Sequence, residues 1–308
     1  MFFATSRRVL CPIAFVGAVL LSPSAAMADP FAVKDTEGFG IEMTALTMEL
    51  PPGWNGQGRI AWTKPCSANE LYETILTATS PDGQSGLRIM PGHQVNWSDT
   101  TVDRTVDPAI AQMVVAQAEA ARNQMRTAFQ NSNCHVGQVA GTEQILQTLI
   151  LSKRPADVRV VSMKPNEPVI ALYKSGFGAA QTGMIVRYES QIIEMAYTGP
   201  AGPMVERLWL TWYQFSDDPQ FNYMVGVPTL RYQNTTIASI TFAYAPAGRA
   251  ADLDTAAAAL ATVKADTGWT AKVREVQERI NEERRRAQKE RSDAADQRHK
   301  DFIDMIRQ

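Results

Sequence analysis

The last forty residues of the chain, 269–308, contain neither proline nor glycine, and this stretch limits the possible folds more than any other. Between Lys272 and Lys300 it holds ten basic and seven acidic side chains. Opposite charges recur four residues apart, and such pairs stabilise an exposed helix by about 0.3 kcal/mol each. The sequence therefore predicts one charged helix about 60 Å long, too polar along most of its length to be buried in a core.

The apolar residues of this predicted helix gather at its two ends: Trp269, Val273, Val276 and Ile280 at the start, and Phe302, Ile303, Met305 and Ile306 at the finish. One interpretation is a solvated helix that docks on the preceding domain through its first two turns. The other is an arm that forms a coiled coil or binds a protein partner. Glu283 and Glu290 stand where a heptad repeat requires apolar residues, which argues against a strong self-dimer.

The chain begins with a pattern typical of a cleavable signal peptide. Residues 1–8 carry two arginines and no acid, residues 9–21 are apolar, and Ala26-Met27-Ala28 places small residues at −3 and −1 before Asp29. The apolar run of 13 residues is shorter than the roughly 20 that a membrane span requires. We therefore predict cleavage between Ala28 and Asp29 and a mature bacterial protein that is periplasmic or secreted.

Removal of this segment leaves a chain of ordinary charge, with 28 basic and 32 acidic side chains and a net charge of −4. This balance lacks the excess of basic residues that nucleic-acid binding proteins carry. We expect no stable membrane span after cleavage. Arg7 and Arg8 fit the positively charged start of a general secretory signal and partly match a twin-arginine signal. Both export routes stay open.

Cleavage leaves two cysteines, Cys66 and Cys134. In an oxidising compartment this pair predicts one disulfide, which in the chain-entropy model stabilises the fold by about 4 kcal/mol. The alternative is a reactive cysteine, since His135 follows Cys134 in the sequence. Neighbours in sequence rarely face each other, and a nucleophile normally takes its base from elsewhere in the fold.

Segments with period-two alternation or many β-branched and aromatic residues predict strands. The predicted strands are 41–48, 59–62, 71–78, 87–90, 158–163, 169–173, 182–188, 191–197, 208–215 and 237–244. Glu189-Ser190 is predicted to turn a hairpin. Residues 208–215 are apolar on both faces, as in a central strand that is covered on each side.

Three helices are predicted among these strands, at about 107–130, 142–150 and 253–264. Asp107 caps the first and Pro108 opens it. Its predicted inner face consists of Ile110, Met113, Val114, Ala118, Ala121, Met125 and Phe129. The expected fold is thus α+β: an antiparallel sheet flanked by helices in residues 29–268, followed by the charged helix of residues 269–308.

No catalytic or metal-binding motif stands out in the sequence. His93, His135 and His299 have no ligand at metal-binding spacing. Gly176-Phe177-Gly178 lacks the third glycine position and the following helix of a dinucleotide loop. We therefore assign no catalytic, cofactor-binding or metal residue, and no cofactor.

The densest aromatic group lies in the predicted strand 208–215. Trp209, Tyr213 and Phe215 share one face of that strand, because alternate residues of a strand point the same way. Such a face stacks on a sugar or small ligand when it is exposed, and forms core when it is covered.

The segment Met48-Glu49-Leu50-Pro51-Pro52-Gly53-Trp54, with hairpins after it and Pro246-Ala247-Gly248 before a docked helix, resembles exported bacterial proteins of the PsbP/Mog1/DcrB type. The resemblance covers residues 38–265. It implies helices laid across an antiparallel sheet and a largely non-catalytic, accessory or binding role. The charged C-terminal helix departs from that layout and is similar to the tails of uncharacterised proteobacterial secreted proteins.

Three hypotheses about function follow. The first is an exported accessory or binding module that contacts a protein partner through residues 269–308. The second is an envelope hydrolase with dispersed catalytic groups, which a structure with His93 or His135 within reach of a nucleophile would favour. The third is a glycan or small-ligand binder that uses the face of Trp209, Tyr213 and Phe215.

Overall fold

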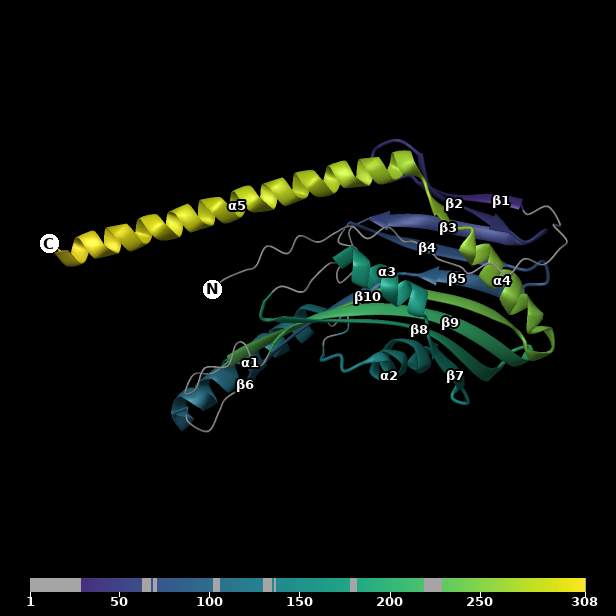
Figure 1. Cartoon of the computed structure of the whole chain (residues 1–308), viewed down its shortest axis with the longest axis horizontal. Helices are drawn as coiled ribbons and strands as arrows, with labels where there is room; N and C mark the ends of the chain where they lie inside the picture. The colour runs from purple at the N-terminus through teal and green to yellow at the C-terminus, as the bar shows by residue number, and fades with distance from the viewer. Residues whose placement is uncertain are drawn as a thin grey trace.

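The computed structural model describes residues 29–62, 68, 71–101, 106–129, 135, 137–177, 182–218 and 229–307. The fold is α+β, as the sequence predicts, with an antiparallel eight-stranded sheet, helices on its faces and a long helix that extends from the body (Figure 1). The strands are β1 (Asp29–Asp35), β2 (Met43–Leu50), β3 (Asn55–Trp62), β4 (Tyr72–Thr79), β5 (Gly86–Met90), β6 (His93–Thr101), β7 (Arg159–Pro165), β8 (Met184–Gly199), β9 (Gly202–Asp217), β10 (Thr229–Pro246) and β11 (Lys264–Ala265). The α-helices are α1 (Pro108–Phe129), α2 (Thr142–Ile145), α3 (Glu167–Phe177), α4 (Ala251–Ala261) and α5 (Thr267–Arg307).

Three long strands, β8, β9 and β10, form the middle of the large sheet, whose order is β3-β4-β5-β10-β9-β8-β7. β10 pairs with β5 along residues 240–244 and with β6 along residues 229–237, so β6 continues the sheet beyond β5. β8 and β9 form a hairpin whose turn ends at Gly202. The φ angle of Gly202 is 109°, a conformation that favours glycine.

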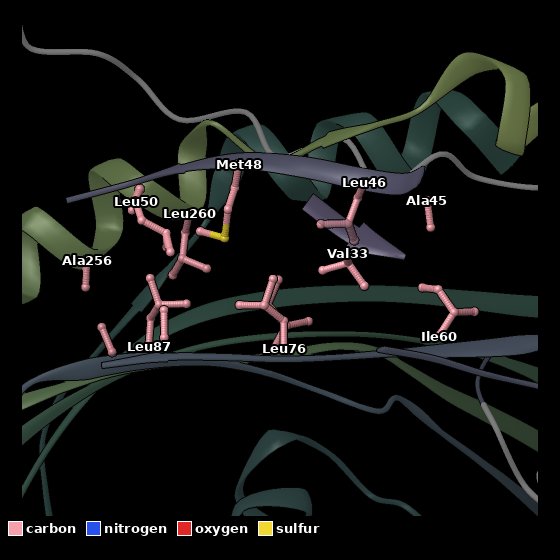
Figure 2. Close-up of a cluster of buried hydrophobic side chains, with 14 of the residues drawn as sticks. Val33, Ala45, Leu46, Met48, Leu50, Ile60, Leu76, Leu87, Ala256 and Leu260 are labelled. Carbon is pink, nitrogen blue, oxygen red and sulfur yellow. The ribbon is translucent and has the colours of Figure 1, made fainter. Parts of the chain in front are cut away.

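A first core lies between the large sheet and a layer made of β1, β2 and α4. Alternate side chains of β2, Leu46, Met48 and Leu50, are buried. Figure 2 shows them pointing toward Leu76 and Leu87 of the large sheet. α4 adds Leu253, Ala256, Ala259 and Leu260 to this core. Burial of one such leucine contributes about 2 kcal/mol, so these contacts hold β2 and α4 against the large sheet.

A second core lies against the other face of β8, β9 and β10. α2 continues through a π-helical turn (Leu146–Ile150) and a 3-10 turn (Leu151–Lys153), which confirms the predicted helix at 142–150. Trp212 of β9 is fully buried there and donates its indole N–H to Oγ1 of Thr142 at 2.9 Å. The predicted two-sided burial of residues 208–215 is confirmed for one face only: Leu208, Leu210 and Trp212 are buried, whereas Trp209, Tyr213 and Phe215 on the other face are half-buried.

The prediction of a strand at residues 169–173 is wrong, because these residues belong to α3. The amides of Val169 and Ile170 donate to the carbonyl of Asn166, each at 3.1 Å, and so start the helix. Tyr173 and Phe177, one turn apart, stack with ring centroids 6.1 Å apart. Helical spacing of the two aromatic residues and their tertiary packing outweigh the β propensity of the segment.

The predicted hairpin at Glu189-Ser190 is also wrong, because β8 runs through both residues without a break. Polarity suggested a turn, but both side chains have partners within the fold. The hydroxyls of Ser190 and Thr211 are 2.8 Å apart and buried. Glu189 accepts a hydrogen bond from Oγ1 of Thr142 at 2.8 Å. A polar pair with satisfied hydrogen bonds is tolerated inside a sheet.

α1 lies alongside β6, where Figure 1 shows it at one end of the sheet. Asp107 caps it as predicted, since Oδ1 accepts hydrogen bonds from the amides of residues 109 and 110 at 2.8 and 3.3 Å. The predicted inner face is wrong in part. Ile110 and Met113 are 48% and 53% exposed, whereas Val114 and Ala118 are half-buried. The helix is therefore rotated relative to the prediction, with Val114, Ala118 and Met125 on its half-buried side.

Candidate functional site

α5 is attached to the body by a short strand and a helix cap. β11 pairs with β2, and the amide of Asp266 donates to the carbonyl of Ala45 at 2.9 Å. Oδ1 of Asp266 then accepts a hydrogen bond from the amide of Trp269 at 2.9 Å. This is the geometry of an N-cap, which typically contributes about 1 kcal/mol to a helix. The beginning of α5 is therefore fixed before its first turn is complete.

The first turn of α5 is fastened to the body by the buried carboxylate of Asp35, at the end of β1. Trp269 Nε1 donates to Oδ2 of Asp35 at 2.8 Å, and Trp62 Nε1 lies 3.0 Å from both carboxylate oxygens. The amides of Glu37 and Gly38 donate to Oδ1 at 3.1 and 2.9 Å. Asp35 is fully buried, and four donors replace the water that its charge loses.

These donors set the ionisation of Asp35. Burial raises the pKa of this carboxyl, but the hydrogen bonds from the indole of Trp269, the amide of Gly38 and the other donors lower the pKa by more. The pKa of Asp35 therefore lies below its ordinary value. At neutral pH, the start of α5 is held by a charged group.

Apolar packing continues the attachment for about three turns. Trp269 and Val273 are 4% and 2% exposed, and Val276 and Ile280 pack on the same core. The ring of Trp269 meets that of Tyr72 edge to face, with centroids 4.7 Å apart. The predicted apolar stripe at the start of the C-terminal helix is thus confirmed as its docking face.

Beyond Ile280, α5 extends away from the body as a free arm (Figure 1). From Asn281 to Asp301 every side chain is exposed except Ala287, which is half-buried. Contacts within the helix replace packing: Lys289 pairs with Asp293 at 2.7 Å, four residues away. We call residues 281–301 the arm; it carries seven basic and six acidic side chains. The helical backbone continues to Arg307.

The predicted ligand face of Trp209, Tyr213 and Phe215 is divided by α3. Phe177 of α3 packs on the rings of Tyr213 and Phe215, with centroids 4.7 and 5.7 Å apart. These two aromatic side chains are therefore partly covered by the protein itself. Trp209 is half-buried and lines a groove on the same face of the sheet.

The histidines of the hydrolase hypothesis differ in their surroundings. Burial lowers the pKa of His93, and the positive charges of Lys153 and His135 lower it further. Burial also lowers the pKa of His135. His135 lines a cavity of only about 10 Å³, the space of one water molecule. His299 is exposed and lies on the arm, on a different element from His93 and His135.

Other predicted sites fall outside the described residues: Cys66 and Cys134 of the disulfide, and Ala28 on one side of the cleavage site. Asp29, on the other side, is the first residue of β1. Among the residues that the structure describes, no group of three or more His, Cys, Asp or Glu side chains is arranged to hold a metal ion. No helix in that part of the chain combines the length and hydropathy of a membrane span.

Comparison of the chain with protein-family models, curated proteins and solved structures found no match. The sequence patterns do not predict the attachment of α5 at Asp35. The signal for it in the sequence is weak: an acid, Asp35, stands at the end of the alternating segment 31–35, three residues before Gly38.

Proposed function

We propose that this protein is an exported accessory module whose body holds a charged helical arm for contact with a protein partner. One observation carries the proposal: α5 is anchored firmly at its root and then extends exposed from Asn281 to Asp301. A helix that packs on nothing gains little stability from its own fold. Contact with another molecule explains its length better than support of the body does.

The charge pattern of the arm favours a protein surface as its partner. Its seven basic and six acidic side chains are interspersed, which suits a surface that also carries both signs. A nucleic acid or an anionic membrane would select a predominantly basic face. The sequence ends with Phe302, Ile303, Met305 and Ile306, the residue types that anchor an amphipathic helix in a partner's groove.

The proposal includes the export of the chain. Residues 1–28 supply the signal peptide pattern, and two cysteines remain after cleavage at Ala28. We propose that the mature protein is periplasmic or secreted, with Cys66 and Cys134 joined in a disulfide. Mass spectrometry of the secreted or periplasmic fraction tests both points, since the mature chain should begin at Asp29 and contain no free thiol.

The experiment for the arm removes residues 282–308 and keeps the docked first turns of α5. Full-length and truncated chains are cross-linked in the cell envelope and recovered, and their partners are quantified by mass spectrometry. We expect the truncated chain to remain folded and monomeric. The amount of partner recovered with it should fall at least about tenfold.

A matched control replaces residues 282–308 with a helix of the same length built from EAAAK repeats. This variant restores the helix length and the mixed charge without the native side chains. We expect that it does not restore the recovery of the partners. Equal recovery of the same partners by full-length and truncated chains would contradict the proposal. So would the absence of any partner that is enriched with the full-length chain.

A further inference from the structure

A groove of about 360 Å³ is formed on the large sheet, with Ala257 of α4 in its lining. Its volume falls in the range of small-molecule sites, roughly 300–1,000 Å³. Phe177 of α3 packs on Tyr213 and Phe215 farther along β9, whereas Trp209 lines the groove. It is separate from α5, so this inference does not rest on the proposed role of the arm.

The floor of the groove consists of two adjacent rows of paired residues on β7, β8 and β9. The first row is Ser162, Glu194 and Arg207, and the second is Lys164, Ile192 and Trp209. Within each row the residues are direct cross-strand partners. Three neighbouring strands span about 10 Å, so each row is as long as two linked sugar rings.

The first row is a connected polar chain. Ser162 donates to Oε2 of Glu194 at 3.3 Å, and Arg207 donates to Oε1 of Glu194 through Nε and Nη2 at 3.2 and 3.1 Å. Arg207 also donates to Asp254 of α4 at 2.8 Å. These contacts fix the polar groups in place, while Glu194 stays 41% exposed.

The second row is a platform rather than a polar chain. Trp209 and Ile192 are both half-buried and lie side by side in register. Lys164 stands at the outer end of the row, exposed. An indole ring next to a branched side chain offers a flat apolar surface, and a polar row runs parallel to it. A ligand that matches both rows has an apolar face and a hydroxyl-bearing edge.

The charges around the groove set the class of ligand. Lys164 and Arg207 carry two positive charges, and Glu194 and Asp254 carry two negative charges. The four charges balance, and the guanidinium of Arg207 is already paired with both carboxylates. A strongly anionic ligand would have to compete with those carboxylates. A neutral ligand with hydroxyl groups can donate to the acids and accept from the cations.

We propose that this groove binds a neutral saccharide of about two pyranose rings, with one ring face on Trp209 and the hydroxyl edge along Ser162, Glu194 and Arg207. The test uses the mature chain and isothermal titration calorimetry with maltose, cellobiose and N,N′-diacetylchitobiose. We expect saturable binding of at least one of them, with a Kd of about 1 mM or below. Glucuronic acid serves as the anionic comparison and should bind more weakly.

Two tryptophan variants locate the binding. Trp209→Ala should weaken it by at least about tenfold, whereas Trp209→Phe keeps an aromatic platform and should retain most of the affinity. Trp97→Ala is the matched control: Trp97 is half-buried on β6, outside the groove lining, and should leave the affinity unchanged. Near-UV circular dichroism confirms that each variant is folded.

Three outcomes would overturn the proposal. The first is that none of the three disaccharides binds at concentrations up to about 20 mM. The second is equal binding by the wild type and by folded Trp209→Ala. The third is a preference for glucuronic acid over every neutral sugar, which would assign the groove to an anionic ligand instead.

Discussion

The indole nitrogen of Trp269 lies 2.8 Å from the carboxylate of Asp35, although 234 residues separate the two in the sequence. The first strand of the described chain thereby holds the start of its last helix. Both groups are buried, at 4% and 0% exposure, so the contact lies in a low dielectric where it is strong when made and costly when broken. Together with the N-cap at Asp266, this contact holds the first turn of α5 on the body.

Replacement of Asp35 by alanine should destabilise the protein by about 3 kcal/mol, because the indole N–H groups of Trp62 and Trp269 lose their acceptor. Urea unfolding followed by circular dichroism measures the change. The matched control is Asp293→Ala on the arm, where an exposed pair with Lys289 is lost; it should cost under about 0.5 kcal/mol. Equal effects of the two substitutions would show that the buried contact has no special role.

The same carboxylate predicts a pH dependence. The folded pKa of Asp35 lies below its ordinary value, so the unfolded chain takes up the proton first as the pH falls. The stabilisation is therefore fully present above the unfolded pKa of about 3.9 and is lost as the pH falls through the folded pKa. Urea midpoints at stepped pH values below neutrality should show this loss in the wild type and less of it in Asp35→Asn. Parallel curves for both proteins would count against the assignment.

A second buried charge joins the helical layer below the sheet to β9. Arg154 donates to both oxygens of Glu206 at 3.0 and 2.6 Å and lies over the ring of Phe242 at 4.8 Å. Because Glu206 is 2% exposed, Arg154→Met should cost about 3 kcal/mol by leaving that acid without its cation. Glu206→Gln should cost less, and the double variant should recover part of the loss. Additive single effects in urea unfolding would contradict this coupling.

The arm and the body are expected to respond separately to a break in the helix. Ala287→Pro removes a backbone hydrogen bond and disfavours helix locally by about 3 kcal/mol, but Ala287 lies beyond the docked turns. Far-UV circular dichroism should lose helix signal while the urea midpoint followed by tryptophan fluorescence stays constant. Val273→Ala, at a buried position in the docked part, is the contrasting variant and should lower that midpoint.

The sequence predicts the elements that have a strong local signature. The absence of proline and glycine after Trp269 predicts α5, and the Asp107-Pro108 cap predicts the start of α1. It does not predict the pairing of Asp35 with Trp269, because no local pattern records a contact between the two ends of a chain. The sequence also does not predict that α3 divides the face of Trp209, Tyr213 and Phe215. The reason is related: residues 169–173 have a strand-like composition, so the helix that packs on Tyr213 is not expected there.

The resemblance to the PsbP/Mog1/DcrB type and the disulfide between Cys66 and Cys134 stay predictions. The prediction of the inner face of α1 is wrong in part, and the contacts of α1 with β6 show how the helix is oriented. α1 packs on β6, and Arg122 lies over the ring of Trp97 at 5.2 Å. The half-buried side of α1 carries Ala111, Val114, Ala118 and Met125, whereas Ile110 and Met113 are exposed. Hydrophobic periodicity alone assumes that the bulkiest residues face inward.

This orientation of α1 gives a paired test with neighbouring residues. Met113→Lys places a charge at a position that is 53% exposed and should change the free energy of unfolding by less than about 0.5 kcal/mol. Val114→Lys places the same charge against β6, where the side chain is half-buried, and should cost about 1–2 kcal/mol. Urea unfolding gives the global effect, and hydrogen exchange along residues 108–129 shows whether α1 loosens first. A larger cost for Met113→Lys than for Val114→Lys would mean that α1 packs through the side of Met113, which the structure leaves exposed.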